Sequence, residues 1–109
     1  MRTDRVIRDG KTAVLYSPGF GAGWYTWGHE QWMLFHPRLV AAVEAKDPGS
    51  RIAEISDELA TEFGVDAPYT GGANQLQIEW VPVGARFEIS EYDGAESVRM
   101  HDEIDHLIA

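Results

Sequence analysis

The chain of 109 residues contains no cysteine, which excludes a disulfide framework, a thiolate metal site and a cysteine nucleophile. Long apolar runs are absent as well, because nowhere do about 20 consecutive residues have the apolar character of a membrane-spanning helix. The first residues are charged throughout, unlike those of a secretory signal peptide. We therefore expect a cytoplasmic protein that neither enters nor crosses a membrane.

Basic residues are scarce, with 9 Lys and Arg against 18 Asp and Glu and a net charge of −9. This balance repels phosphate groups, so direct binding of DNA or RNA is not expected. Four basic residues lie within residues 2–11, whereas residues 88–109 carry seven carboxylates and a single arginine, Arg99. Such asymmetry can steer a partner, although a solvated acidic face that only maintains solubility accounts for the same composition.

Alternating apolar and polar residues predict strands in both halves of the chain. An amino-terminal hairpin is expected over residues 5–7 and 12–16, with a turn at Asp9-Gly10. Two antiparallel strands are expected over residues 76–80 and 87–89. A third strand over residues 97–100 should follow a turn at Asp93-Gly94.

Apolar residues three or four positions apart predict helices between these strands. One helix should begin at Pro37 and end before Pro48-Gly49. The next should cover residues 50–63, with Ser50 as its N-cap and Gly64 as its stop. A small helix is expected over residues 102–109, after an acidic first turn.

The predicted order is two strands, two helices, three strands and a small helix. We therefore expect an α+β fold in which residues 1–109 form a single compact domain. Its sheet should be mostly antiparallel, with about four or five strands and two or three helices packed on one face.

Residues 17–27, Ser-Pro-Gly-Phe-Gly-Ala-Gly-Trp-Tyr-Thr-Trp, combine alternate glycines with large flat side chains. Glycine lets the backbone turn tightly and lets its amides approach a ligand, while aromatic rings stack on bases or pack at interfaces. The competing interpretation is a core role, in which the chain turns beneath rings that only fill the interior. The candidate ligand-binding residues are Ser17, Gly19, Gly21, Gly23, Trp24, Tyr25 and Trp27.

Two blocks carry a resemblance to a known family. Residues 13–24 include Ser-Pro-Gly-Phe-Gly-Ala-Gly-Trp, and residues 84–96 include Glu-Tyr-Asp-Gly. Together they resemble a family of small phage and prophage proteins to which no function is assigned, marked by S-P-G-F/Y-G-A-G-W and E-Y-D-G. The resemblance implies an origin in a mobile element and carries over no catalytic residue. Because small acidic phage proteins are often antagonists of host defence, it also implies a protein of the host cytoplasm.

Known nucleotide-binding and nucleophile patterns are not met. The glycine series places Trp24 near the position of the third glycine of G-x-G-x-x-G, and no Gly-Lys-Ser/Thr follows for a P-loop. Ser17 lies outside the G-x-S-x-G pattern of a reactive serine and reads more readily as a turn residue before Pro18.

Histidine spacing also argues against a metal centre. His29-Glu30 and His36 lack the H-E-x-x-H spacing of zinc-binding helices. In residues 101–106, two histidine and aspartate pairs would lie on different faces of the expected helix, which favours surface ion pairs. We therefore expect no catalytic residue, no metal and no cofactor.

A negative patch is expected on the carboxy-terminal strands. It can occupy a nucleic-acid channel of a host protein by presenting carboxylates where phosphates bind, with an affinity that falls as salt rises. The candidate partner-binding residues are Glu79, Glu88, Glu91, Asp93 and Glu96.

The favoured interpretation is a non-catalytic antagonist of host defence. Residues 17–27 would bind either a small anionic, nucleotide-like ligand or a partner protein such as a host defence protein, alone or across the seam of a homodimer or higher homo-oligomer. The first alternative is an acidic inhibitor that uses its carboxylate patch to block a nucleic-acid-binding surface of a host effector. A small enzyme of unknown reaction ranks third, because no nucleophile, base and electrophile support one another.

Overall fold

The computed structural model describes residues 4–19, 23–101 and 107–108. The elements in chain order are β1 (Ile7–Arg8), β2 (Lys11–Tyr16), α1 (Tyr25–Gly28), α2 (Trp32–Phe35), α3 (Pro37–Glu44), α4 (Gly49–Phe63), the 3-10 helix η1 (Ala73–Gln75), β3 (Gln77–Pro82), β4 (Arg86–Tyr92), β5 (Ala95–His101) and β6 (Leu107–Ile108). Helices and antiparallel strands together confirm the predicted α+β class.

The strands form two antiparallel sheets, in the orders β1-β2-β3 and β5-β4-β6. Both predicted hairpin turns are confirmed: Asp9 and Gly10 have φ of 52° and 75°, and Asp93 and Gly94 have φ of 53° and 85°. Two successive positive φ values are the geometry of a type I′ turn, which suits the twist of the flanking strands. The expected single sheet is wrong, because β3 pairs with β2 whereas β4 pairs with β5 and β6.

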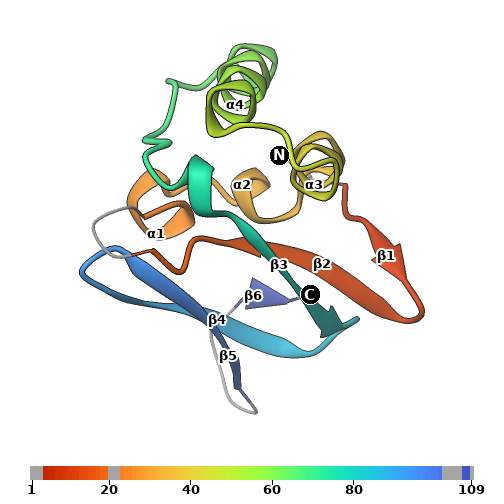
Figure 1. Cartoon of the computed structure of the whole chain (residues 1–109). Coiled ribbons are helices and arrows are strands. Elements are labelled where there is room, and N and C mark those ends of the chain that lie inside the picture. The colour runs from red at the N-terminus through yellow and green to blue at the C-terminus, as the bar shows by residue number, and fades with distance from the viewer. Residues whose placement is uncertain (1–3, 20–22, 102–106, 109) are drawn as a thin grey trace.

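Strand β2 lies between two layers, with helices α3 and α4 on one side and the second sheet on the other (Figure 1). Its residues alternate accordingly: Ala13 and Leu15 belong to the core cluster shared with the helices. Val14, from the opposite face, belongs to a smaller cluster that includes Phe87 of β4. The helices α3 and α4 therefore cover one face of the first sheet, as expected.

Helix ends follow the expected local signals at three of four positions. Pro37 is the first residue of α3, and α3 ends at Glu44, before Pro48. Gly64 ends α4 in the left-handed conformation with φ of 71°. The N-cap assignment of Ser50 is wrong, because Pro48 occupies the cap position and the helix begins at Gly49. Among the described residues, no helix is both long and apolar enough to cross a membrane.

The predicted helix over residues 102–109 falls mostly outside the described residues. Leu107 and Ile108, which are described, form strand β6 and pair with Phe87 and Arg86 of β4. The helical prediction is wrong at these two residues, because hydrogen bonding to β4 stabilises an extended backbone there.

Candidate functional site

The loop predicted to bind a ligand closes around the carboxylate of Glu96, a residue of β5 that is only 3% exposed. Oε1 accepts a hydrogen bond from the backbone N–H of Ser17 at 2.9 Å. Oε2 accepts from the backbone N–H groups of Trp24 at 3.0 Å and Thr26 at 2.8 Å, and from the Thr26 hydroxyl at 2.6 Å. The Glu96 N–H donates in turn to the Ser17 carbonyl at 2.7 Å, so both ends of the loop are fastened to β5.

Three backbone amides thus converge on an anion, but that anion is part of the protein. A free anion cannot use the same N–H groups without displacing a buried, charge-assisted set of hydrogen bonds. The prediction that Glu96 belongs to an outward negative patch is therefore wrong, because its carboxylate is buried and forms its hydrogen bonds within the fold. Ser17, predicted to contact a ligand, is itself fully buried.

Trp24 is an interior residue. Its side chain has no exposed surface, and its indole N–H donates to the Met33 carbonyl at 2.6 Å. The expected stacking of Trp24 on a ligand is thus wrong for this conformation, and the competing core interpretation describes this residue. Gly19 is half-buried, and a Cβ there would lie 1.2 Å from the amide end of the Gln75 side chain, which would have to move aside.

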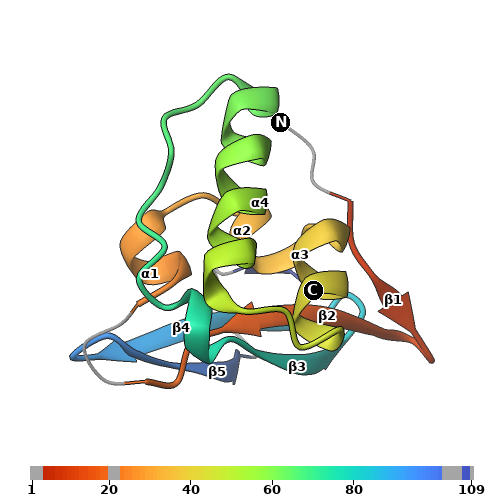
Figure 2. The same cartoon turned by 45° about the horizontal axis from the view of Figure 1, so that its top comes forward.

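Trp27 of α1 differs, because 38% of it is exposed and its ring contacts Tyr69, which is 44% exposed. The ring centroids lie 5.2 Å apart, and the ring planes are inclined at 53°. The segment that follows α4 carries Tyr69 and runs beside α1 (Figure 2). We call Trp27 and Tyr69 the aromatic pair. Tyr25, also predicted, is half-buried, and this burial raises the pKa of its phenol.

Glycines hold both rings of the aromatic pair close to the backbone. A Cβ at Gly23 would lie 2.5 Å from the Trp27 ring, and a Cβ at Gly71 would lie 2.0 Å from the Tyr69 hydroxyl. The two segments are also joined directly, since the Gly72 N–H donates to the Gly23 carbonyl at 3.0 Å. Gly21 lies outside the described residues.

Tyr69 was not predicted as a site residue. A signal was present, because Tyr69 lies close to Gly71-Gly72 in the sequence, and the aromatic residues of positions 24–27 likewise lie close to the glycines of positions 19–23. The two glycine-rich segments meet in the fold. Their contact could not be read from either segment alone.

The five predicted partner-binding carboxylates do not gather on one surface. Glu79 lies on β3 opposite Val14 in the first sheet, whereas Glu88 lies on β4 opposite Arg99 in the second. Glu91 is exposed and accepts a hydrogen bond from the Gly94 N–H at 2.7 Å, which stabilises the hairpin turn. Asp93 is also exposed and occupies that turn with φ of 53°.

The two described arginines near the amino terminus, Arg5 and Arg8, have partners outside residues 17–27. Arg8 pairs with Glu44 at 2.5 Å and lies over the Trp80 ring, while Arg5 lies over the Phe35 ring. The hydrogen bond from Arg8 lowers the pKa of Glu44. Arg38 and Arg51 both approach Glu58. Each of these arginines therefore has a partner that is not a ligand.

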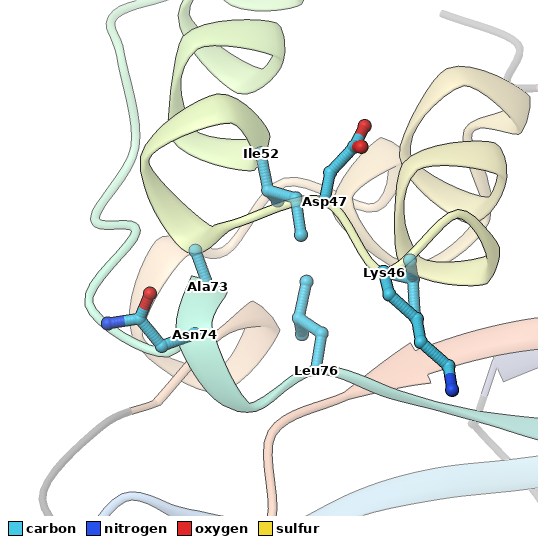
Figure 3. Close-up of a pocket in the computed structure, with 7 residues that line it drawn as sticks. Lys46, Asp47, Ile52, Ala73, Asn74 and Leu76 are labelled. Carbon is cyan, nitrogen blue, oxygen red and sulfur yellow. The ribbon is translucent and has the colours of Figure 1, made fainter.

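A cavity of about 230 Å³ lies where the end of α3, the start of α4 and η1 meet (Figure 3). Ile52 and Leu76 point into it, whereas the polar ends of Lys46, Asp47 and Asn74 point away (Figure 3). It lacks the convergent polar groups that orient a small ligand, and none of the predicted site residues lines it. Its lining residues are Val43, Lys46, Asp47, Ile52, Ala73, Asn74 and Leu76.

Comparisons with family models, with curated proteins and with solved structures find no significant match to this chain. The resemblance to phage proteins thus rests on the two sequence blocks and stays a prediction.

A metal centre finds no geometric support in the part of the chain that is described. No group of three or more histidine or acidic side chains there is placed to hold an ion. His101 ends strand β5, whereas Asp102, Asp105 and His106 lie outside the described residues. Among the described residues that were predicted to bind a ligand, Trp27 is the exposed one, and the fold places Tyr69 in contact with it.

Proposed function

We propose that this protein is a non-catalytic binding protein that contacts another protein through the aromatic pair. The observation that carries the proposal is that Trp27 and Tyr69 remain 38% and 44% exposed while touching each other and resting against glycine backbone. Aromatic side chains bury large apolar areas at interfaces and often dominate the binding energy there.

The backbone beneath the pair is held in place before any partner arrives. Glu96 fastens residues 17, 24 and 26 to β5, and the Gly72 to Gly23 hydrogen bond fastens the Tyr69 segment to the same loop. A preformed surface loses less conformational entropy on binding than a mobile one. This rigidity favours a recognition role for the two exposed rings.

A protein partner fits the charges better than a small anion does. The segments that carry the pair, residues 12–37 and 52–85, contain no lysine or arginine. The three converging amides of the loop already bind Glu96. An anionic ligand would therefore meet neither a cation from these segments nor those amides.

The proposed partner is a protein of the host cell, and the resemblance to phage proteins favours a host defence protein in the cytoplasm. A second copy of the chain is the other protein that the pair can contact. Neither partner requires a cofactor or a catalytic residue.

Affinity capture with matched variants tests the proposal. Tagged wild-type protein, the double variant Trp27→Ala/Tyr69→Ala and the control Met100→Ala are expressed in a bacterial host, and retained proteins are quantified by mass spectrometry. Met100 is a suitable control because it is 54% exposed on β5. We expect wild type and control to retain a protein at least about tenfold better than the double variant, which is about 1.4 kcal/mol of binding energy.

The retained protein is then purified and titrated into each variant by calorimetry, so that capture alone does not decide the outcome. Equal affinity for wild type and double variant would show that the proposed surface is wrong. Native mass spectrometry gives two further outcomes. A homodimer that dissociates in the double variant would identify the partner as a second copy, whereas a co-purified nucleotide that is lost in the double variant would show that the pair binds a small ligand and not a protein.

A further inference from the structure

Strand β3 is an edge of the first sheet, and in the part of the chain that the structure describes it pairs only with β2. The Ala13 N–H donates to the Val6 carbonyl at 2.9 Å, so the backbone groups of Ala13 point towards β1. Successive residues of a strand point their backbone groups to opposite sides, so those of Val14 point towards β3, where Glu79 is the partner. The backbone groups of Glu79 are therefore used within the sheet.

The two neighbours of Glu79 on β3, Ile78 and Trp80, point their N–H and C=O groups the other way, to the free edge. No described residue forms a backbone hydrogen bond with these four groups. Pro82, the next residue in this alternating series, has no N–H and is tolerated at an edge for that reason. A row of unpaired backbone groups is a template for another extended chain. Its complement is therefore a β-strand.

The cavity between α3, α4 and η1 lies at the amino-terminal end of this edge. Leu76 points into the cavity and precedes β3 with an extended backbone, and it packs with Ile78 and Trp80 against the helix-side core (Figure 3). Directly opposed residues of antiparallel strands place their side chains on the same face, with Cβ atoms about 5 Å apart. A ligand residue opposite Leu76 therefore lies beside this cavity of about 230 Å³.

The chemistry of the cavity suits an apolar side chain that is already held by its backbone. Ile52 and Leu76 point into the cavity, whereas the polar ends of Lys46, Asp47 and Asn74 point away (Figure 3). Convergent polar groups that orient a free small molecule are lacking there. Along a strand edge, hydrogen bonds of the main chain orient the ligand, and pockets for alternate side chains give specificity.

Glu79 determines which chain can pair at this edge. It is exposed, and none of the ion pairs among the described residues includes it. A second copy paired by two-fold symmetry uses all four free groups when Ile78 lies opposite its Trp80, and this register places Glu79 opposite itself. Like charges directly opposite each other destabilise paired strands, and a net charge of −9 on each copy adds repulsion. Lysine or arginine opposite Glu79 forms a favourable pair instead.

We infer that the free edge of β3 binds an extended segment of a partner protein as an added antiparallel strand. The backbone of that segment pairs with Ile78 and Trp80, a basic side chain lies opposite Glu79, and an apolar side chain enters the cavity beside Leu76. This site goes beyond the proposed function, because neither residue of the aromatic pair lies on β3 or lines the cavity.

A synthetic peptide with this pattern tests the inference. The probe is the acetylated and amidated peptide Thr-Val-Lys-Val-Thr-Leu-Thr with a fluorescent label, titrated with wild-type protein by fluorescence anisotropy. Paired antiparallel, its valines lie opposite Trp80 and Ile78, its lysine opposite Glu79 and its leucine opposite Leu76. We expect saturable binding, and absence of binding would overturn the inference.

Two variants remove the edge and the cavity separately. Ile78→Pro deletes an N–H that no described residue accepts, and should raise the dissociation constant at least about tenfold. Leu76→Phe fills the cavity and should raise it about fivefold, while a peptide with alanine in place of leucine should lose its sensitivity to this variant.

The matched control is a proline at the edge of the second sheet. The Glu96 N–H donates to Ser17, which is not on β4, so Met100, four residues further along β5, also points its N–H away from β4. Met100→Pro should leave the dissociation constant unchanged. Trp27→Ala/Tyr69→Ala should also leave it unchanged, so this site and the aromatic pair are confirmed or rejected independently of each other.

A charge exchange tests the contact with Glu79. Glu79→Lys should weaken binding of the lysine peptide about fivefold and strengthen binding of the same peptide with glutamate in place of lysine. Raising the salt concentration should weaken binding of the lysine peptide to wild type. A merely structural role of Glu79 would not reverse the preference, so an unchanged preference would overturn the assigned register.

Modified peptides keep the test decisive if Ile78→Pro does not fold, which circular dichroism shows. Methylation of the two valine nitrogens removes the N–H groups that face β3 and should weaken binding at least about tenfold, whereas methylation of the lysine nitrogen, which faces away, should not. Equal effects of the two methylations would overturn strand addition. A homodimer that native mass spectrometry detects in wild type and not in Ile78→Pro would identify a second copy as the occupant and overturn the choice of a partner protein.

Discussion

Two tryptophans three positions apart in the same loop have opposite surroundings. Trp24 is fully buried, and its N–H donates to Met33, whereas Trp27 is 38% exposed and contacts Tyr69. The difference arises at α1, which begins at Tyr25 and turns the chain so that residue 24 points into the core and residue 27 lies at the surface. One glycine-rich segment therefore serves both as architecture and as a candidate contact surface.

Glu96 lies at the boundary between the buried part of the loop and its exposed part. Its carboxylate accepts hydrogen bonds from the backbone N–H groups of Ser17 and Trp24, and this fixes where the buried half of the loop ends. The exposed half is positioned indirectly, through Thr26 and through the Gly72 to Gly23 hydrogen bond. Interior packing and surface recognition should therefore respond differently to substitution.

The largest expected effect is the contrast between the two tryptophans. Trp24→Ala should lower the free energy of unfolding by about 4 kcal/mol, because it removes a fully buried ring and leaves the Met33 carbonyl without its donor. Trp27→Ala should cost about 1 kcal/mol while removing partner binding. Urea denaturation measures both losses.

If Trp24→Ala does not fold, Trp24→Phe keeps much of the ring and should cost about 2 kcal/mol through the lost hydrogen bond and reduced volume. Equal losses for Trp24→Phe and Trp27→Phe would contradict the contrast.

Removing the buried carboxylate is the next largest effect. Glu96→Ala leaves three backbone N–H groups and the Thr26 hydroxyl without their acceptor, and should cost about 3 kcal/mol. Glu96→Gln should cost less, because the amide oxygen still accepts hydrogen bonds while its NH2 faces other donors. The exposed residue Glu79 is the control, and Glu79→Gln should change the free energy of unfolding by less than about 0.5 kcal/mol.

A loss for Glu96→Ala no larger than that for Glu79→Gln would show that the loop does not depend on the carboxylate. If Glu96→Ala is too unstable to purify, hydrogen exchange of Glu96→Gln tests the same point. Faster exchange at Ser17, Trp24 and Thr26 than in wild type is expected, and unchanged protection would contradict the clamp.

Features set by neighbouring residues were predictable from sequence, and those set by distant contacts were not. The turns at Asp9-Gly10 and Asp93-Gly94, the start of α3 at Pro37 and the end of α4 at Gly64 all follow from backbone preferences of one or two residues. The division into two sheets was missed because strand partners are chosen by tertiary packing.

The role of Glu96 was missed for the same reason. Its partners lie 70 to 79 residues earlier in the chain, so no local pattern reveals them. One signal was available, because Glu96 is two residues from Val98 on β5. It therefore lies on the same face of the strand, which packs against the core. A carboxylate on an apolar face requires buried donors, and the glycine-rich loop supplies them.

A smaller effect of pH is expected outside the loop, at the junction of α2 and α3. The His36 Nδ1 accepts a hydrogen bond from the Arg38 N–H at 3.1 Å and caps α3. Burial, and secondarily the Arg38 charge, lowers the pKa of His36 from its ordinary value of 6.5, against weaker opposing effects of Glu62 and Asp4. The folded state therefore favours neutral His36.

The unfolded chain binds this proton more readily than the folded protein does. The contribution of His36 to the free energy of unfolding is therefore fully present above about pH 6.5 and is lost as the pH drops below that value. We expect a loss below about 1 kcal/mol between pH 7.5 and 5.5, measured by urea denaturation. His36→Asn keeps a capping acceptor without a titrating ring and should flatten this dependence. His29→Gln should retain it, and a flat wild-type profile would contradict the capping role.

The smallest expected effect tests whether the two exposed rings act as one unit. A double-mutant cycle of Trp27→Ala and Tyr69→Ala should give a coupling free energy of about 0.5 kcal/mol in the free protein, because the rings touch at 5.2 Å but remain partly in water. The same cycle measured on partner binding should give a larger coupling, since a partner that covers both rings shields them from solvent. Coupling near zero in both cycles would mean that Trp27 and Tyr69 are independent surface residues, and the division of the loop into a buried half and a recognition half would then lose its second part.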